Sequence, residues 1–171
     1  MNGALTLRKA QPSDMATLLA LINGYASRGL LLPRTEASLR ERLDDFTVAE
    51  QGGRLLGCGA LSELGPGLGE VRSLAVAEDA AGLGIGHAVV DHLFEEAKGR
   101  GFREVIALTR RQSFFERLGF AVTERERFVD KLRVDCAACP KNVCCDEIAM
   151  VRRVSVSSAA TAGSTPAGAF R

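Results

Sequence analysis

Three glycines stand at alternate positions in the stretch AAGLGIGHAVV, residues 80–90. Gly82, Gly84 and Gly86 lead directly into residues with the apolar spacing of a helix. Glycine weakens a helix, so its repeated use here indicates that something approaches the backbone closely. The first turn of a helix offers free N–H groups and the positive end of the helix dipole. The stretch therefore predicts a site for an anion, most often a phosphate.

Two common phosphate-binding motifs do not fit this stretch. The dinucleotide fingerprint G-x-G-x-x-G fails at its last position, where this chain has Val89, and that fold would place the motif after its first strand. A P-loop requires a Gly-Lys pair, and the sequence contains none. A glycine turn that binds nothing remains the alternative, because glycine caps are common.

Hydrophobic periodicity predicts the elements that position this turn. Helices are expected over residues 12–29, 35–43, 85–98 and 113–118. Strands are expected near residues 5–7, 46–50, 54–61, 70–78, 104–109, 119–124 and 147–151. Meandering strands followed by a β-α-β unit indicate an α/β (α+β) fold with a mixed sheet and helices on its faces.

Composition predicts one ordinary globular domain. The chain has 171 residues, 46% of them hydrophobic and 25% charged, with a formal net charge of +1. This balance gives no basic field for nucleic acid, and no apolar run is long enough to span a membrane. The N-terminus has no apolar core of signal-peptide length, so a cytoplasmic location is expected. We expect a folded domain over residues 1–152 and a disordered tail over residues 153–171, where small and polar residues predominate.

Three motifs in this order carry a resemblance to a known family: EVRSLAV (70–76), GLGIGHAVVDHL (82–93) and FFERLGF (114–120). They resemble the acetyl-CoA site of the GNAT N-acetyltransferases, and the resemblance covers about residues 5–151. It implies a GNAT-like, mostly antiparallel sheet with helices on both faces. Within that family the chain is most similar to the short bacterial N-acetylglutamate synthase type, through GLLLPRT (29–35), VAEQGGRLLGCGAL (48–61), GEVRSLAV (69–76), ALT (107–109) and DCAACPKNVCCDEIAM (135–150).

The resemblance implies that acetyl-CoA is the co-substrate and that an amine is acetylated directly, with the amino group of L-glutamate, in arginine biosynthesis, as the expected acceptor. Backbone N–H groups around Leu74–Val76 would polarise the thioester carbonyl, as in an oxyanion hole. The glycine turn would bind the pyrophosphate. The implied coenzyme-binding residues are Leu74, Ala75, Val76, Ala81, Gly82, Leu83, Gly84, Ile85, Gly86, His87 and Phe115.

The same resemblance assigns the chemistry of transfer. Glu70 corresponds to the general base, which takes the amine proton through water, and Thr109 to a hydroxyl residue near the sulfur. Arg34 corresponds to an arginine that binds glutamate in the synthases. Strand alternation places Arg72 on the same face as Glu70, where its guanidinium suits a substrate carboxylate. Surface salt bridges remain the alternative for both arginines.

The sequence departs from the family pattern at two positions. Ala81 stands where the turn usually opens with Arg or Gln, so one side-chain contact to phosphate is missing. Phe115 stands where many relatives place a tyrosine that acts as general acid, and a phenyl ring has no proton to donate. His87 and His92 have no evident catalytic partner, and Cys58 is expected in the core.

Four cysteines form a separate group: Cys136, Cys139, Cys144 and Cys145. Packing of a C-terminal loop, structural zinc, and a disulfide or redox role all remain open, and no metal site is assigned. The synthases hold glutamate with basic residues near this segment, where this chain has Cys144, Cys145 and Asp146. The alternatives to glutamate acetylation are therefore another small amine, a protein N-terminus, or an acyl-CoA-binding sensor that uses the cysteines. The sequence leaves a homodimer open.

Overall fold

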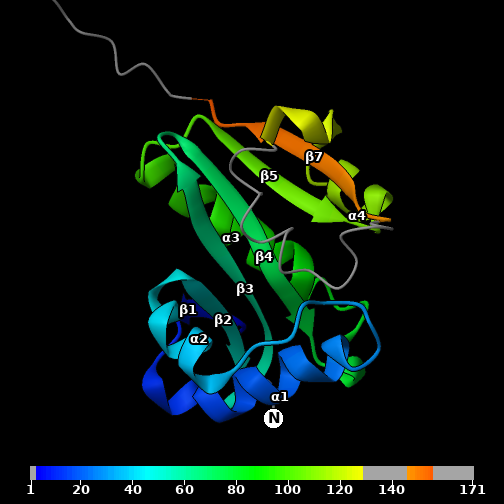
Figure 1. Ribbon diagram of the computed structural model, residues 1–171. Helices are drawn as coiled ribbons and strands as arrows, with labels where there is room; N and C mark the ends of the chain where they lie inside the picture. The colour runs from blue at the N-terminus through cyan, green and yellow to red at the C-terminus, as the bar shows by residue number, and fades with distance from the viewer. Residues whose placement is uncertain (1–2, 129–145, 156–171) are drawn as a thin grey trace, which may run out of the picture.

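The computed structural model describes residues 3–128 and 146–155 (Figure 1). Its seven-stranded sheet has the order β1-β2-β3-β4-β5-β7-β6. The strands are β1 (Thr6–Lys9), β2 (Phe46–Gln51), β3 (Arg54–Gly65), β4 (Leu68–Val76), β5 (Glu104–Thr109), β6 (Ala121–Val122) and β7 (Ile148–Arg153). The helices are α1 (Met15–Ala26), α2 (Glu36–Glu41), α3 (Ile85–Gly99) and α4 (Gln112–Glu116). Single 3-10 turns lie at Pro12–Asp14, Leu43–Asp45, Glu78–Ala80 and Arg125–Phe128.

The sheet is mixed and mostly antiparallel. Among the strands of residues 3–128 and 146–155, only β4 and β5 run parallel, and α3 connects them. The other neighbouring pairs are antiparallel. This confirms the fold class that the order of elements predicted.

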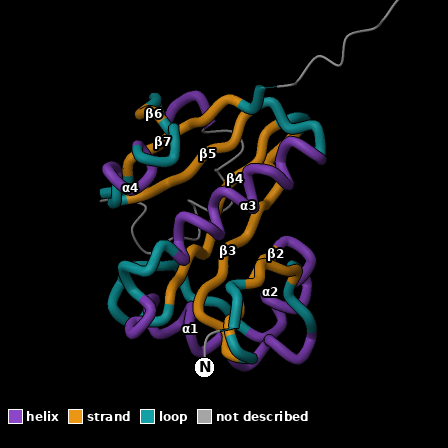
Figure 2. The backbone as a smooth tube through the Cα atoms, turned by 180° about the vertical axis from the view of Figure 1, so that it is seen from behind, coloured by secondary structure: helices purple, strands orange, loops and turns teal. Residues whose placement is uncertain are grey.

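Helices cover both faces of the sheet. Leu18 and Ile22 of α1 pack with Leu39 of α2 against Phe46 and Val48 on one face. On the other face, the apolar side of α3 packs in a second cluster with residues of β3, β4 and β5. Helices α1 and α2 lie toward the viewer in Figure 1, and α3 lies toward the viewer in Figure 2. The sheet is therefore the middle of three layers.

Two glycines in β3 set how closely α3 approaches the sheet. A Cβ on Gly57 would lie 2.8 Å from Ile85, and a Cβ on Gly59 would lie 2.8 Å from Val89. The first turns of α3 thus rest almost on the strand backbone. This contact fixes the start of α3 beside the end of β4.

Several element boundaries differ from the expected ones: α1 is shorter than the helix expected over residues 12–29, and β3 continues to Gly65 rather than ending at residue 61. The strand expected over residues 119–124 is reduced to β6 (Ala121–Val122), which pairs with β7. Strand β7 continues to Arg153, and Val154 is buried with its N–H donating to the Arg103 carbonyl at 2.8 Å. Val154 thus packs with the sheet directly after β7, and the domain boundary expected at residue 152 stays a prediction. The expected disordered tail lies mostly outside the described residues.

Candidate acetyl-transfer site

Strands β4 and β5 separate part-way along their length. Their parallel pairing ends at Val71 and Ala107, although β4 continues to Val76 and β5 to Thr109 (Figure 1). The divergence coincides with a bulge. Between the pairs Cys58–Ala75 and Ala60–Arg72, β4 has one residue more than β3, and Ser73 adopts a φ of +50°. Such a bulge bends a strand and ends its regular pairing.

The bulge leaves one edge of β4 open. The Ala77 N–H donates to the Leu56 carbonyl of the neighbouring segment at 2.8 Å. Backbone groups of successive residues point to opposite edges of a strand, so the N–H and C=O of Val76 point toward the open side. Leu74, two residues earlier, shares that orientation. The edge of β4 can thus pair with a ligand that carries amide groups.

A cavity of about 590 Å³ lies in this opening. Eleven of the predicted site residues line it: Leu74, Ala75, Val76, Ala81, Gly82, Gly84, Ile85, Gly86, His87, Thr109 and Phe115. Leu83 does not line the cavity, and its side chain is 69% exposed. Glu70, Arg72 and Arg34 also lie outside the lining. We call the cavity and the open edge of β4 the coenzyme cleft, after the ligand that the resemblance to the GNAT N-acetyltransferases implies.

The glycine turn presents bare backbone to this cleft. Gly82 and Gly84 have φ values of +78° and +79°, a region that favours glycine, and a Cβ on either would meet nothing within 4 Å. Gly84 is the N-cap of α3, so the free N–H groups of the first turn follow it directly. This geometry fits a pyrophosphate group. Gly86 has another reason to lack a side chain, because a Cβ there would lie 3.3 Å from the Phe114 ring.

The residues predicted to handle the acceptor lie at the bulge. Glu70 is 5% exposed, and its Oε2 lies 3.6 Å from the Arg72 Nε, which confirms that the two side chains share a face. From the loop before α2, an Arg34 Nη donates to the Ser73 Oγ at 3.4 Å. Two guanidinium groups and one carboxylate thus gather where β4 leaves β5.

Asn23, which no sequence pattern singled out, fixes the position of Arg34. The Asn23 Oδ1 accepts from the Arg34 N–H at 2.9 Å, and its Nδ2 donates to the Arg34 carbonyl at 2.9 Å. One amide side chain therefore clamps the backbone of Arg34 to α1. No local pattern indicates this pairing, because the two residues lie on either side of a loop.

The hydroxyl of Thr109 keeps its proton available. Thr109 is 8% exposed at the end of β5, and its Oγ1 accepts from the Arg111 N–H at 2.8 Å. A hydroxyl that accepts one hydrogen bond can still donate another. Thr109 could therefore donate to a developing thiolate in the cleft.

Aromatic side chains line the cleft. The residue at position 115 is a phenylalanine, which cannot act as a general acid. Phe115 is buried between Phe114 and Phe120, with ring centroids 5.1 and 5.2 Å away. Tyr25 is the only tyrosine of the chain and was not singled out from the sequence. It lines the cleft from α1, and its hydroxyl donates to the Val76 carbonyl at 2.6 Å.

Cys58 lies in the core, as expected. It is fully buried, and burial raises the pKa of its thiol to about 12. The neutral thiol is a poor nucleophile, so the structure gives no support to transfer through a cysteine at this position. The other four cysteines lie outside the described residues. Within residues 3–128 and 146–155, no three His, Cys, Asp or Glu side chains come together as metal ligands.

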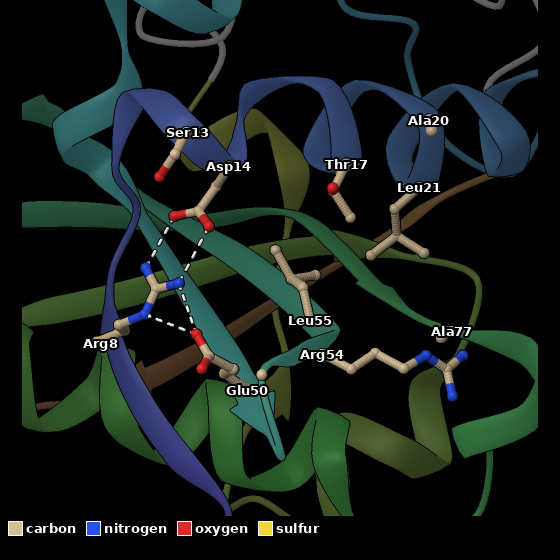
Figure 3. A pocket seen from close by; sticks show the side chains of 11 residues that line it. Arg8, Ser13, Asp14, Thr17, Ala20, Leu21, Glu50, Arg54, Leu55 and Ala77 are labelled. Atoms are coloured by element: carbon tan, nitrogen blue, oxygen red, sulfur yellow. Dashed lines mark hydrogen bonds and ion pairs between the residues drawn. The ribbon is translucent and has the colours of Figure 1, made fainter.

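A second cavity, of about 560 Å³, is lined by charged residues that bond to one another (Figure 3). Arg8 lies between Asp14 and Glu50, and we call these three residues the Arg8 cluster. Arg8 donates to Glu50 at 2.7 and 3.0 Å, to Asp14 at 2.8 and 3.0 Å, and to the Lys9 carbonyl at 3.2 Å. All five guanidinium N–H groups are used, so the cluster has no donor left for a ligand.

Comparison with known proteins identifies the family. The sequence matches the Acetyltransferase (GNAT) family model over residues 16–120. The chain belongs to this family. GNAT acetyltransferases take the acetyl group from acetyl-CoA, which is therefore the co-substrate. Across the described ranges, no helix combines the length and apolar character that crossing a bilayer requires.

Individual relatives point in the same direction. The chain is 38% identical over 146 residues to an uncharacterized N-acetyltransferase of Chlorobaculum tepidum, covering 85% of this chain and 94% of that protein. It is 39% identical over 121 residues to an amino-acid acetyltransferase of Mycobacterium tuberculosis, covering 69% of each. The N-acetylglutamate synthase from Neisseria gonorrhoeae, complexed with coenzyme A and N-acetyl-glutamate, superposes with a TM-score of 0.82 at 26% identity. That match covers 91% of this chain and 36% of the larger enzyme.

Proposed function

We propose that this GNAT enzyme acetylates the α-amino group of an amino acid, with L-glutamate as the acceptor. The observation that carries the proposal is the group of Glu70, Arg72 and Arg34 at the β4 bulge, next to the coenzyme cleft. An amino acid needs both kinds of group: a base for its amine and a cation for its carboxylate. Two guanidinium groups suit an acceptor with two carboxylates, which L-glutamate has. Relatives named amino-acid acetyltransferase and N-acetylglutamate synthase support the same acceptor class.

Each residue has a role in direct transfer. Bound acetyl-CoA supplies an acetyl thioester, whose carbon–sulfur bond breaks as the new carbon–nitrogen bond forms. Glu70 takes the proton that the amine must lose before it can attack, through a bridging water. Arg34 and Arg72 hold the acceptor carboxylates. Backbone N–H groups around Leu74–Val76 polarise the thioester carbonyl, and the Thr109 hydroxyl donates to the sulfur as negative charge develops there.

Glutamate acetylation would place the enzyme in the cytoplasm, in arginine biosynthesis, and these assignments belong to the same proposal. The pairing of Arg72 with Glu70 is compatible with it. A substrate carboxylate can take over one side of a guanidinium whose other side still faces Glu70, because Arg presents five donors in a plane.

Thiol release from acetyl-CoA, measured with one candidate acceptor at a time, tests the proposal. We expect L-glutamate to give the highest kcat/KM and N-acetyl-L-glutamate as the product by mass spectrometry. L-Glutamine has the same shape without the side-chain charge, and we expect it to react at least about 10-fold more slowly. Equal rates with L-glutamine, or a preference for a peptide N-terminus, would contradict the acceptor assignment.

The Glu70→Gln variant tests the base. We expect kcat to fall about 100-fold at pH 7, with a smaller loss at high pH, where the amine is already neutral. Glu63→Gln is the matched control, because Glu63 lies in the neighbouring strand β3 with a half-exposed side chain. A Glu70→Gln enzyme with wild-type kcat at pH 7 would remove Glu70 from the mechanism.

A further inference from the structure

Three arginines line the coenzyme cleft: Arg110, Arg111 and Arg117. They differ in what their guanidinium groups contact. Arg110 donates to the Gly29 carbonyl at 2.7 Å and to the Asp146 carboxylate at 3.2 Å. Its charge is therefore committed to holding the loop after α1 against the start of β7.

The guanidinium groups of Arg111 and Arg117 are not committed in this way. Neither makes a hydrogen bond or ion pair with any residue in the ranges 3–128 and 146–155. Both side chains belong to exposed residues that flank the short helix α4 at the rim of the cleft. Most other arginines near a cavity here have a carboxylate partner, as Arg8 and Arg54 do. Two cations without a carboxylate partner among the described residues, in a cavity whose other charged lining residues are Arg110 and Glu147, favour an anionic ligand group.

An aromatic contact orients one of them. The Arg111 guanidinium carbon lies 5.5 Å from the centroid of the Phe114 ring. The Phe114 ring packs against Gly86 and meets the His87 ring edge-on at 4.9 Å. A guanidinium that lies over a ring keeps the N–H groups along its edge free to donate. Arg111 is thus held next to the glycine turn, and its guanidinium donors bond to no residue that the structure describes.

Coenzyme A carries a 3′-phosphate in addition to the pyrophosphate that the glycine turn would bind. Its pyrophosphate fits the bare backbone at Gly82 and Gly84 and the free N–H groups of α3. Its 3′-phosphate is a separate monoester, which carries a charge between about −1.5 and −2 at pH 7. Such a group is best bound by guanidinium donors, which can hold two of its oxygens at once.

We propose that Arg111 and Arg117 bind the 3′-phosphate of coenzyme A, so that the enzyme selects coenzyme A over dephospho-coenzyme A. The proposal rests on the assignment of the cleft to the coenzyme and is independent of the acceptor. The two arginines also supply side-chain contacts to phosphate in a chain whose glycine turn opens with Ala81 rather than Arg or Gln.

Calorimetric titration of the full chain with coenzyme A and with dephospho-coenzyme A tests this proposal. We expect the wild type to bind coenzyme A about 30-fold more tightly than dephospho-coenzyme A. The double variant Arg111→Gln/Arg117→Gln should lose about 30-fold in affinity for coenzyme A and less than about 3-fold for dephospho-coenzyme A. Each single variant should lie between these limits. Because both side chains are exposed, the variants should keep the circular dichroism spectrum of the wild type.

Arg110→Gln is the matched control, because it removes the same charge from the same wall. Its guanidinium is committed to Gly29 and Asp146, so any loss of affinity should be the same for both ligands. An equal loss for both ligands in the double variant would move the contact to the pyrophosphate and overturn the proposal. So would a folded wild type that binds the two ligands equally well. A wild type that binds neither ligand would overturn the coenzyme assignment itself, and this proposal with it.

Discussion

The coenzyme cleft and the cavity that contains the Arg8 cluster have similar volumes, but their polar groups differ in how many hydrogen bonds they already make. In the Arg8 cluster, one guanidinium uses all five N–H groups on two carboxylates and a carbonyl (Figure 3). The carboxylates raise the pKa of Arg8, and the hydrogen bonds from Arg8 lower the pKa of Asp14. In the cleft, a strand edge faces open space, and Gly82 and Gly84 hold the backbone in left-handed conformations.

The difference shows how a structural cluster can be told from a ligand site: in the structural cluster, the hydrogen-bond donors are already used within the protein. Arg8 joins β1, the start of α1 and β2, so its interactions stabilise the fold and leave nothing for a ligand. The cleft retains backbone donors, and the Arg111 and Arg117 guanidinium groups in it make no hydrogen bond or ion pair within the described part of the chain. Both cavities are lined by charged side chains, so charge alone does not distinguish them, whereas the unused hydrogen-bonding capacity indicates the cleft.

Gly84→Val should have the largest effect on binding. Valine is strained at a φ of +79°, and its side chain would occupy the space that the pyrophosphate needs. We expect the affinity for acetyl-CoA to fall at least about 100-fold. Gly101→Val is the control, because Gly101 has a φ of +75° and open space but follows the other end of α3. The two variants should lose similar stability, and similar affinities in both would contradict the role of the turn.

Arg8→Met should lower the stability of the fold and leave the affinity for acetyl-CoA unchanged. Removal of Arg8 leaves the partly buried Asp14 and Glu50 without their partner, which we expect to cost about 2 kcal/mol. For a domain of this size, that loss corresponds to a fall in Tm of about 4–8 °C. Arg54→Met removes an exposed ion pair with Asp79 and should leave Tm almost unchanged. A drop in coenzyme affinity for Arg8→Met at 25 °C would show that the two regions are coupled.

The pH dependence of stability tests the structural role of Asp14 in the Arg8 cluster. The pKa of Asp14 is lower in the folded chain than its ordinary value of about 3.9, so its stabilising effect is complete above that value and is lost as the pH falls through the folded pKa. Urea unfolding should therefore give a wild type that is more stable than Asp14→Asn at pH 6, with a difference that shrinks below about pH 4. A difference that stays constant down to pH 2 would exclude Asp14 as the source.

Asn23→Ala should have a smaller and more selective effect. Loss of the clamp on the Arg34 backbone should raise the KM for the amino acid about 10-fold and leave the KM for acetyl-CoA unchanged. Asn23→Asp keeps the acceptor for the Arg34 N–H but loses the donor, so it should restore part of the binding. Ser27→Ala, in the turn that ends α1, is the control. Equal changes in both KM values would indicate a general loss of structure instead.

The sequence predicted the parts of this site that depend on local order. Alternation in β4 placed Glu70 beside Arg72, and the glycine spacing located the turn before α3. The clamp by Asn23 and the bond from Tyr25 to Val76 join residues that are distant in the chain and carry no periodic signal. The Arg8 cluster has the same property, because Arg8 and Glu50 meet only once β1 pairs with β2. The reason for Gly86, close contact with Phe114, also required the packed structure.

Hydrogen exchange at two neighbouring amides tests most directly whether the open edge of β4 is the coenzyme site. The Ala77 N–H is already bonded to Leu56, whereas the Val76 N–H points toward the open edge. We expect saturating coenzyme A to slow exchange at Val76 at least about 10-fold, while exchange at Ala77 and at residues 8–14 stays nearly constant. Unchanged exchange at Val76, or slowing centred on the Arg8 cluster, would contradict the account.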